Sequence, residues 1–235
     1  MNLAPVIQYR PFSPMKTLLA PIASASMMVF TATAATVDWG TATSNVLGDK
    51  NGNLAANTGT VRLGYFSGLT DVQIASAAAE GNKISLSGSF QTFDSVSIGT
   101  GYGGLAAAWT KSSVNLTTSF AGKQIYYFAL NAGTVAAATQ WGIFTKSADA
   151  AWTFPSDSPS PGSAVNDLSQ VPQNPTGILA GSFGPQTDGG GYFTGGAGAT
   201  LYKMSEISAV PEPATFATGA MLALVAAGAR RRRRG

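Results

Sequence analysis

The residue types that most often carry out catalysis are absent from this sequence. It contains no His and no Cys, so neither a Ser-His-Asp triad nor a Cys-His pair can be assembled. Metal sites built from imidazole or thiolate ligands are excluded for the same reason. A Ser-Lys nucleophile would need a buried Lys, which no pattern in the sequence indicates. We therefore predict that the protein is not an enzyme and that it holds no cofactor and no metal.

Paired carboxylates are the remaining route to hydrolysis, because two acids facing each other across a cleft can cleave a glycosidic bond. Ten acidic residues lie between Asp38 and Glu206, and nearly all of them are Asp in turn-like surroundings such as residues 48–52. Solvated turn positions account for most of them. A secreted carboxylate-dependent glycan hydrolase is therefore kept as an alternative and not as the leading hypothesis.

Asp49, Asn51 and Asn53 have the alternating spacing that begins a calcium-binding loop. The pattern then fails, because Leu54 stands where an EF-hand needs glycine and Thr60 where it needs a bidentate Glu. We interpret this segment as a tight turn.

Aromatic side chains are the remaining candidates for ligand binding, since their flat apolar faces and polar edges suit stacking on sugar rings. The candidates are Trp109, Tyr126, Tyr127, Trp141, Trp152 and Tyr192. Such residues more often form the core of a β-rich domain. If a glycan-binding face exists, we expect Trp152 and Tyr192 to belong to it, because they lie next to two long loops.

The N-terminus has the organisation of a cleavable export signal. Lys16 supplies a positive charge and residues 18–30 form a mildly apolar stretch, too short and too polar to be a good membrane anchor. The small residues that a signal peptidase accepts are Ala32, Ala34 and Ala35. We predict that residues 1–35 form a signal peptide with a short helix, that Met15 is the true start, and that cleavage follows Ala34 or Ala35.

The C-terminus combines three further elements. A short motif consists of Val210, Pro211, Glu212 and Pro213. Residues 214–229 are apolar and nearly reach the ~20 residues that a helix needs to cross a bilayer. Five arginines end the run: Arg230, Arg231, Arg232, Arg233 and Arg234. We predict a transmembrane helix over 214–229, with the arginines as a stop that stays on the cytoplasmic side.

This tail resembles the PEP-CTERM sorting tail of Gram-negative bacteria that make exopolysaccharide. The resemblance implies processing by an exosortase, a membrane transpeptidase-like enzyme that acts near the motif. The same tail is also labelled an ice-binding protein C-terminal domain. That name implies nothing about ice, because such a tail is a sorting signal. A plain tail anchor would give the same orientation without cleavage. The middle of the chain loosely resembles uncharacterised PEP-CTERM proteins, through residues 61–66, 122–131, 140–144 and 177–181.

Residues 36–209 have the length of one extracellular domain. Between the two end segments, seven basic residues stand against ten acidic ones, a net charge of −3. The whole-chain charge of +3 therefore comes from the ends, and we expect no nucleic-acid partner. Without Cys, packing and hydrogen bonds alone must hold the fold.

The periodicity of this domain predicts strands. Period-two alternation occurs in residues 61–66, 84–90, 93–98, 114–120 and 200–207, and short aromatic strands are expected at 141–145 and 152–154. Residues 124–131 are apolar on both faces, which predicts a central strand covered on both sides. Prolines and glycines predict long loops over 155–177 and 185–198.

One short helix is predicted where Thr70 and Gln73 form a capping box and Gly81 supplies the stop. The expected fold is a mostly β, single antiparallel β-sandwich, jelly-roll-like, with this one helix.

The leading hypothesis is an exported, envelope-sorted, non-enzymatic surface or extracellular matrix protein. Its processing partners would be signal peptidase and exosortase, and the inner membrane would hold it transiently before it reaches the envelope or the medium. The resemblance also suggests an association with exopolysaccharide. The alternatives are the secreted hydrolase above and a passive biofilm structural protein.

Overall fold

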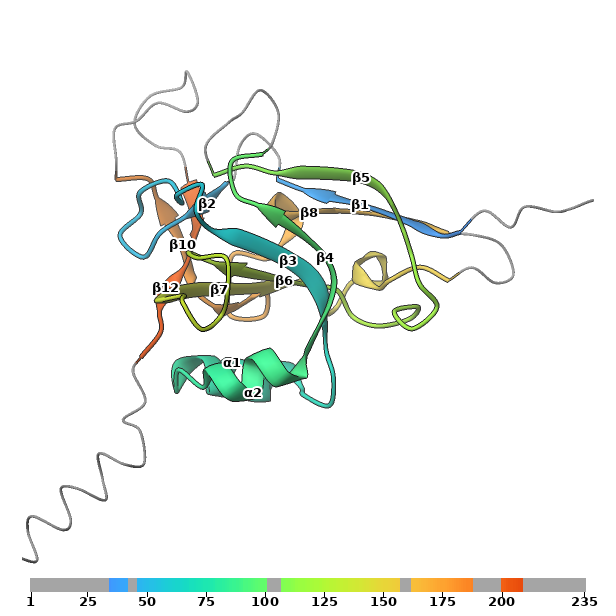
Figure 1. The fold of residues 1–235 in the computed structure, drawn as a ribbon, viewed down its shortest axis with the longest axis horizontal. Helices are drawn as coiled ribbons and strands as arrows, with labels where there is room; N and C mark the ends of the chain where they lie inside the picture. Colours follow the sequence, from blue (N-terminus) through green and yellow to red (C-terminus); the bar gives the residue numbers. More distant parts are fainter. Residues whose placement is uncertain (1–33, 42–45, 101–106, 157–161, 188–199, 209–235) are drawn as a thin grey trace, which may run out of the picture. The chain divides into compact units, whose positions relative to one another are not determined.

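A computed structural model describes residues 34–41, 46–100, 107–156, 162–187 and 200–208 (Figure 1). Their strands are β1 (Thr36–Gly40), β2 (Leu47–Gly48), β3 (Thr60–Phe66), β4 (Phe90–Ser97), β5 (Thr110–Asn115), β6 (Tyr126–Leu130), β7 (Gln140–Thr145), β8 (Ser163–Asp167), β9 (Ile178–Ala180), β10 (Ser182–Pro185), β11 (Thr200–Lys203) and β12 (Ser205–Glu206). Their α-helices are α1 (Asp71–Ala79) and α2 (Lys83–Ser89). The mostly β class is therefore confirmed.

The strands form one large sheet and two small ones. The six-stranded sheet has the order β12-β7-β6-β3-β4, with β9 also paired to β7, and all its pairings are antiparallel. The small sheets have the orders β5-β1-β8 and β10-β11-β2. Each small sheet contains one parallel pair, β1 with β8 and β11 with β2. The expectation of a purely antiparallel domain is wrong at these two pairs, which join segments far apart in the sequence.

Strand β6 is central in the large sheet, as its two-sided apolar pattern predicts. It lies between β3 and β7, and all five of its residues are buried. Tyr127 and Ala129 belong to a core on one face, while Tyr126, Phe128 and Leu130 belong to a core on the other.

Helix α1 begins and ends where the sequence predicts. The Thr70 side chain accepts a hydrogen bond from the backbone N–H of Gln73, and the Gln73 side chain accepts one from the backbone N–H of Thr70. Gly81 follows the helix with a φ of +70°, a conformation that favours glycine.

Helix α2 replaces the strand predicted over 84–90, so the domain has two α-helices and not one. Asn82 caps it by accepting a hydrogen bond from the N–H of Ser85 at 2.9 Å. Leu86 is buried, whereas Ile84 is 87% exposed. The alternation of apolar residues is compatible with a strand as well as with a helix. In the folded chain, the helix allows Leu86 to pack in the core that contains α1 and one face of the sheet.

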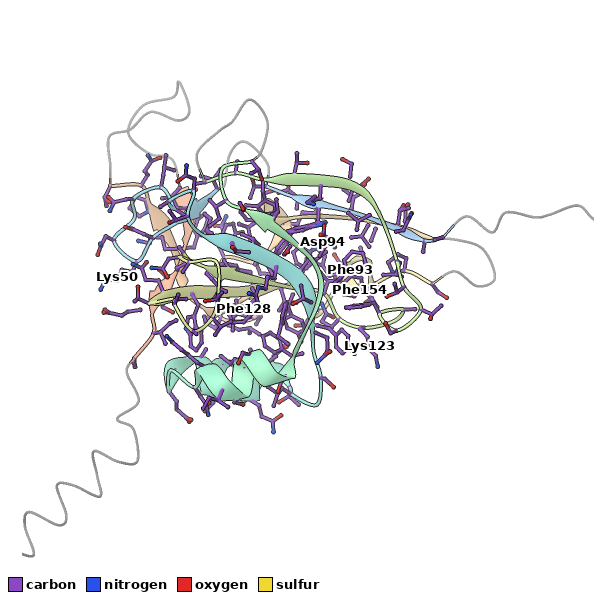
Figure 2. All side chains as sticks on the ribbon, viewed as in Figure 1. Lys50, Phe93, Asp94, Lys123, Phe128 and Phe154 are labelled. Carbon is purple, nitrogen blue, oxygen red and sulfur yellow. The ribbon has the colours of Figure 1, made fainter. Side chains whose placement is uncertain are left out.

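Two hydrophobic cores lie on the two faces of the large sheet. One lies between the sheet and the helices, and its members include Ile74, Leu86, Phe128 and Trp141. Phe128 points from β6 into this layer (Figure 2). The other core joins the sheet to the small sheets through residues that include Trp39, Leu47, Tyr127, Phe144 and Leu201.

The loop predicted over 155–177 is partly wrong. Strand β8 lies within it, followed by a 3-10 helix over Leu168–Gln170. Ala164, Asn166, Leu168 and Val171 from this region are buried. Parallel pairing with β1 is a long-range contact, and no local sequence signal reports it.

Among three further predicted strands, the one over 152–154 is wrong, the one over 114–120 is wrong beyond Asn115, and the one over 200–207 is interrupted. Trp152 belongs to a 3-10 helix over Ala150–Trp152, and Thr153 makes a single bridge to Gln124. The strand predicted over 114–120 ends at Asn115, and the one predicted over 200–207 is divided into β11 and β12.

The predicted sorting elements lie mostly outside the described residues, which include only Ala34 and Ala35 of the signal segment and none of residues 209–235. Within the described part of the chain, no helix has both the length and the apolar character needed to cross a membrane.

Candidate functional site

Trp152, a predicted glycan-binding residue, is part of the core. Its side chain is 1% exposed, and its ring packs edge-on against Tyr127 at a centroid distance of 5.7 Å. The indole N–H donates a hydrogen bond to the Gln170 side chain at 3.2 Å. No face of the ring is available to a sugar, so the glycan role predicted for Trp152 is not compatible with its burial. Tyr192 lies outside the described residues.

The other aromatic candidates are buried as well. Trp109, Tyr126, Tyr127 and Trp141 are all between 0 and 6% exposed. Burial also raises the pKa of the Tyr127 phenol well above its usual value, so this hydroxyl stays neutral and acts as a hydrogen-bonding group. These four residues therefore do not form an aromatic platform for stacking on a sugar. A ligand at the surface of the described domain would have to be recognised by polar side chains.

The Asp49 carboxylate is occupied by its own turn, as the tight-turn interpretation predicts. One oxygen accepts hydrogen bonds from the backbone N–H groups of Asn51 and Asn53 at 2.8 and 2.9 Å. The other oxygen accepts one from the Asn53 side-chain amide at 2.9 Å. Gly52 has a φ of +88° within the turn. These donors use the lone pairs that a calcium ion would need.

Asp94 links the edge of the large sheet to β1 and β5 (Figure 2). Its carboxylate accepts a hydrogen bond from the Trp39 indole at 3.0 Å and lies 3.8 Å from the Lys111 ammonium. This half-buried acid therefore stabilises the contact between two sheets.

Three other acids also have partners, two of them at the surface and Asp71 in a part-buried place. Asp71 accepts from the Tyr126 hydroxyl at 2.6 Å, Asp149 pairs with Lys146 at 2.6 Å, and Glu206 pairs with Lys50 at 2.5 Å. Among the described residues, no three acidic side chains gather as a metal site would require.

A hollow of about 400 Å³ lies over β1, β5 and β8, and two acids are among the residues that line it. Asp38 and Asp167 both line it. The parallel register pairs Asp38 with Val165 and Gly40 with Asp167, so the two acids are diagonal neighbours on one face of the sheet. Asp167 also caps the following 3-10 helix, because its carboxylate accepts from the Ser169 N–H at 2.8 Å.

The two described residues of the signal segment differ in how they are held. Ala35 is fully buried, and its carbonyl accepts a hydrogen bond from the Leu116 N–H at 2.7 Å. Ala34 is only half-buried. Cleavage after Ala34 would keep the Ala35 contacts in the mature domain, whereas cleavage after Ala35 would remove them.

Comparison with models of known protein families, with curated proteins and with solved structures gives no match to this chain.

Proposed function

We propose that this chain is an exported protein that is sorted to the cell envelope and acts there as a non-enzymatic surface or extracellular matrix component. The observation that carries the proposal is the coincidence of an N-terminal export signal with the motif of residues 210–213, the apolar segment 214–229 and the five terminal arginines. Each element alone is weak evidence for sorting, but together they fit one process, which is export followed by retention at the membrane.

Retention at the membrane follows from the cost of moving charge through a bilayer. The apolar segment can enter the membrane, and the arginines cannot cross it cheaply, so the domain would be held on the outer side of the inner membrane. An exosortase acting near Glu212 would then release the domain to the envelope or the medium. The net charge of −3 between the ends suits a soluble outer-surface protein and not a nucleic-acid binder.

We also propose that the layers around Tyr127 form a β-sandwich. The supporting contacts join the large sheet to the small ones: Tyr127 lies 5.8 Å from Trp39 and Phe144 lies 5.5 Å from Tyr202, measured between ring centroids. A strict jelly-roll is antiparallel, and the parallel pairs described above differ from that pattern.

Intact-mass spectrometry of protein recovered from the native envelope and medium tests the sorting proposal. We expect the wild type to begin at Ala35, because cleavage there keeps the buried Ala35 carbonyl bonded, and to end close to residues 211–213. A Glu212→Ala variant should keep its arginines. A Glu206→Ala variant, which removes an acid outside the motif, should be processed like the wild type. If wild type and Glu212→Ala both retain the arginines, the tail is a permanent anchor and the exosortase proposal fails.

A carboxylate-dependent glycan hydrolase is the second candidate, because Asp38 and Asp167 line one hollow. Separate Asp38→Asn and Asp167→Asn variants would each lose hydrolysis of the native exopolysaccharide if the two acids were catalytic. Absence of any hydrolysis by the wild type would exclude this candidate.

A further inference from the structure

A second hollow, of about 370 Å³, lies over the paired strands β3 and β4, next to Gly133. Its lining is rich in hydroxyl groups and contains one cation: Thr60, Arg62, Thr92, Ser95, Val96, Ser97 and Gly133. Strand β4 is the last strand on this side of the sheet (Figure 1). The hollow therefore lies beside a sheet edge along which an extended chain could run.

The strand register places Arg62 on the same face of the sheet as the helices. Arg62 is paired with Phe128 on β6 and with Ser95 on β4. Phe128 packs in the core under the helices, and cross-strand partners share a face. The apolar half of this face is covered, while the half around Arg62 carries hydroxyl-bearing side chains.

The Arg62 guanidinium is poorly matched within the described structure. The hydrogen bond found for it there is a long one of 3.4 Å, to the Gly133 carbonyl. The ion pairs among the described residues use lysines only, at Lys50, Lys111 and Lys146. A guanidinium has five N–H donors, and the only hydrogen bond found for that of Arg62 among the described residues is long and exposed, so most of these donors are free to bind an external anion.

The chemistry of this group defines the ligand class. A guanidinium fork binds carboxylate, sulfate or phosphate through two parallel hydrogen bonds, and the surrounding Ser and Thr hydroxyls can both donate to and accept from sugar hydroxyls. The volume of about 370 Å³ lies within the range of small-molecule sites.

We propose that the β3–β4 hollow binds the negatively charged group of an acidic polysaccharide, with Arg62 as its anchor. The choice of a polysaccharide rests on the proposed function, whereas the anion specificity rests on the geometry of Arg62. The domain is negatively charged as a whole, so general attraction of a polyanion would be weak. Binding should therefore depend on this one position.

The test is calorimetric titration of the full chain in detergent micelles. The probes are an oligomer of galacturonic acid, a neutral glucose oligomer of the same length, and inorganic phosphate. The variants are Arg62→Gln, Arg62→Lys, and Lys50→Gln as a charge-matched control, since Lys50 makes an exposed ion pair with Glu206. Thermal unfolding checks that each variant is folded.

We expect the wild type to bind the acidic oligomer at least about tenfold more tightly than the neutral one, and Arg62→Gln to lose at least about tenfold of that affinity. Arg62→Lys should fall between the two because it keeps the charge without the fork. Lys50→Gln should stay within about twofold of the wild type. Binding of phosphate as tight as that of the oligomer would identify a simple anion site and overturn the polysaccharide assignment.

Two further results would overturn the proposal: unchanged affinity in Arg62→Gln, or equal losses in Arg62→Gln and Lys50→Gln. Neither depends on the tail. A chain whose tail is processed but which does not bind the acidic oligomer contradicts only this inference, and a chain that binds through Arg62 but keeps its arginines contradicts only the sorting proposal.

Discussion

The Tyr127 hydroxyl ties the large sheet to two strands of a small one, and its removal is a direct test of how the layers are joined. The side chain is fully buried on β6. Its hydroxyl donates to the Asn166 carbonyl on β8 at 2.8 Å and accepts from the Gly40 N–H on β1 at 3.2 Å. A Tyr127→Phe substitution keeps the ring and deletes both hydrogen bonds.

The expected loss of stability follows from the number of hydrogen bonds removed, which is two, and from their burial. A buried hydrogen bond contributes about 0.5–1.5 kcal/mol, and a partner left without water costs more. We therefore expect Tyr127→Phe to lower the free energy of unfolding by about 2–3 kcal/mol. For a domain of this size, that corresponds to a decrease in Tm of roughly 5–10 °C.

Urea and thermal unfolding, followed by tryptophan fluorescence, would measure the change. Tyr126→Phe is the matched control, because the hydroxyl of this neighbouring residue makes one part-buried hydrogen bond, to Asp71 at 2.6 Å, whereas the hydroxyl of Tyr127 makes two buried ones. The control should lose about 1.5 kcal/mol, the lower end for one hydrogen bond to a carboxylate, because the half-exposed Asp71 can be hydrated when its partner is removed. A loss below about 0.5 kcal/mol in Tyr127→Phe, or one no larger than in Tyr126→Phe, would refute the role assigned to this hydroxyl.

Three other predictions use the same unfolding measurements. Thr70→Ala should lower the free energy of unfolding by about 1 kcal/mol through loss of the α1 cap, and Thr70→Ser should restore it. Gly81→Ala should lower it by at least about 1–2 kcal/mol, because φ is +70° and an added Cβ would meet the Ser208 backbone; an unchanged Tm would contradict this. Burial raises the pKa of Tyr202 to about 12, while unfolded tyrosines ionise near pH 10. The folded state then binds more protons above pH 10, so stability should be complete below pH 10 and fall as the pH rises toward 12; a Tyr202→Phe variant with an equally steep fall would argue against it.

Several features could be predicted from the sequence because their causes are local. Apolar side chains on both faces of residues 124–131 require a strand covered on both sides, and β6 is central. The capping box at Thr70 and the glycine at position 81 use only near neighbours, and α1 has these limits. The absence of His and Cys excludes triads and imidazole or thiolate metal sites whatever the fold.

Other features were decided by contacts between distant segments. Residues 84–90 have an alternation that fits a strand, but residues 84–89 are helical, with Leu86 in the same buried core as Ile74, and only Phe90 lies in a strand. Strand β8 forms only because β1, more than a hundred residues earlier, offers a parallel edge.

The candidate sites depend even more on tertiary structure. The residue type of Trp152 suits stacking on a sugar ring, but in the folded chain its ring packs against Tyr127 and belongs to the hydrophobic core. Nothing in the sequence singles out Arg62. Only strand pairing places its guanidinium in a hollow whose described lining contains hydroxyl groups and no carboxylate. The types and spacing of residues near one another in the sequence limit which chemistry and which local elements are possible. Burial and side-chain contacts depend on residues far apart in the sequence, which only the folded chain brings together.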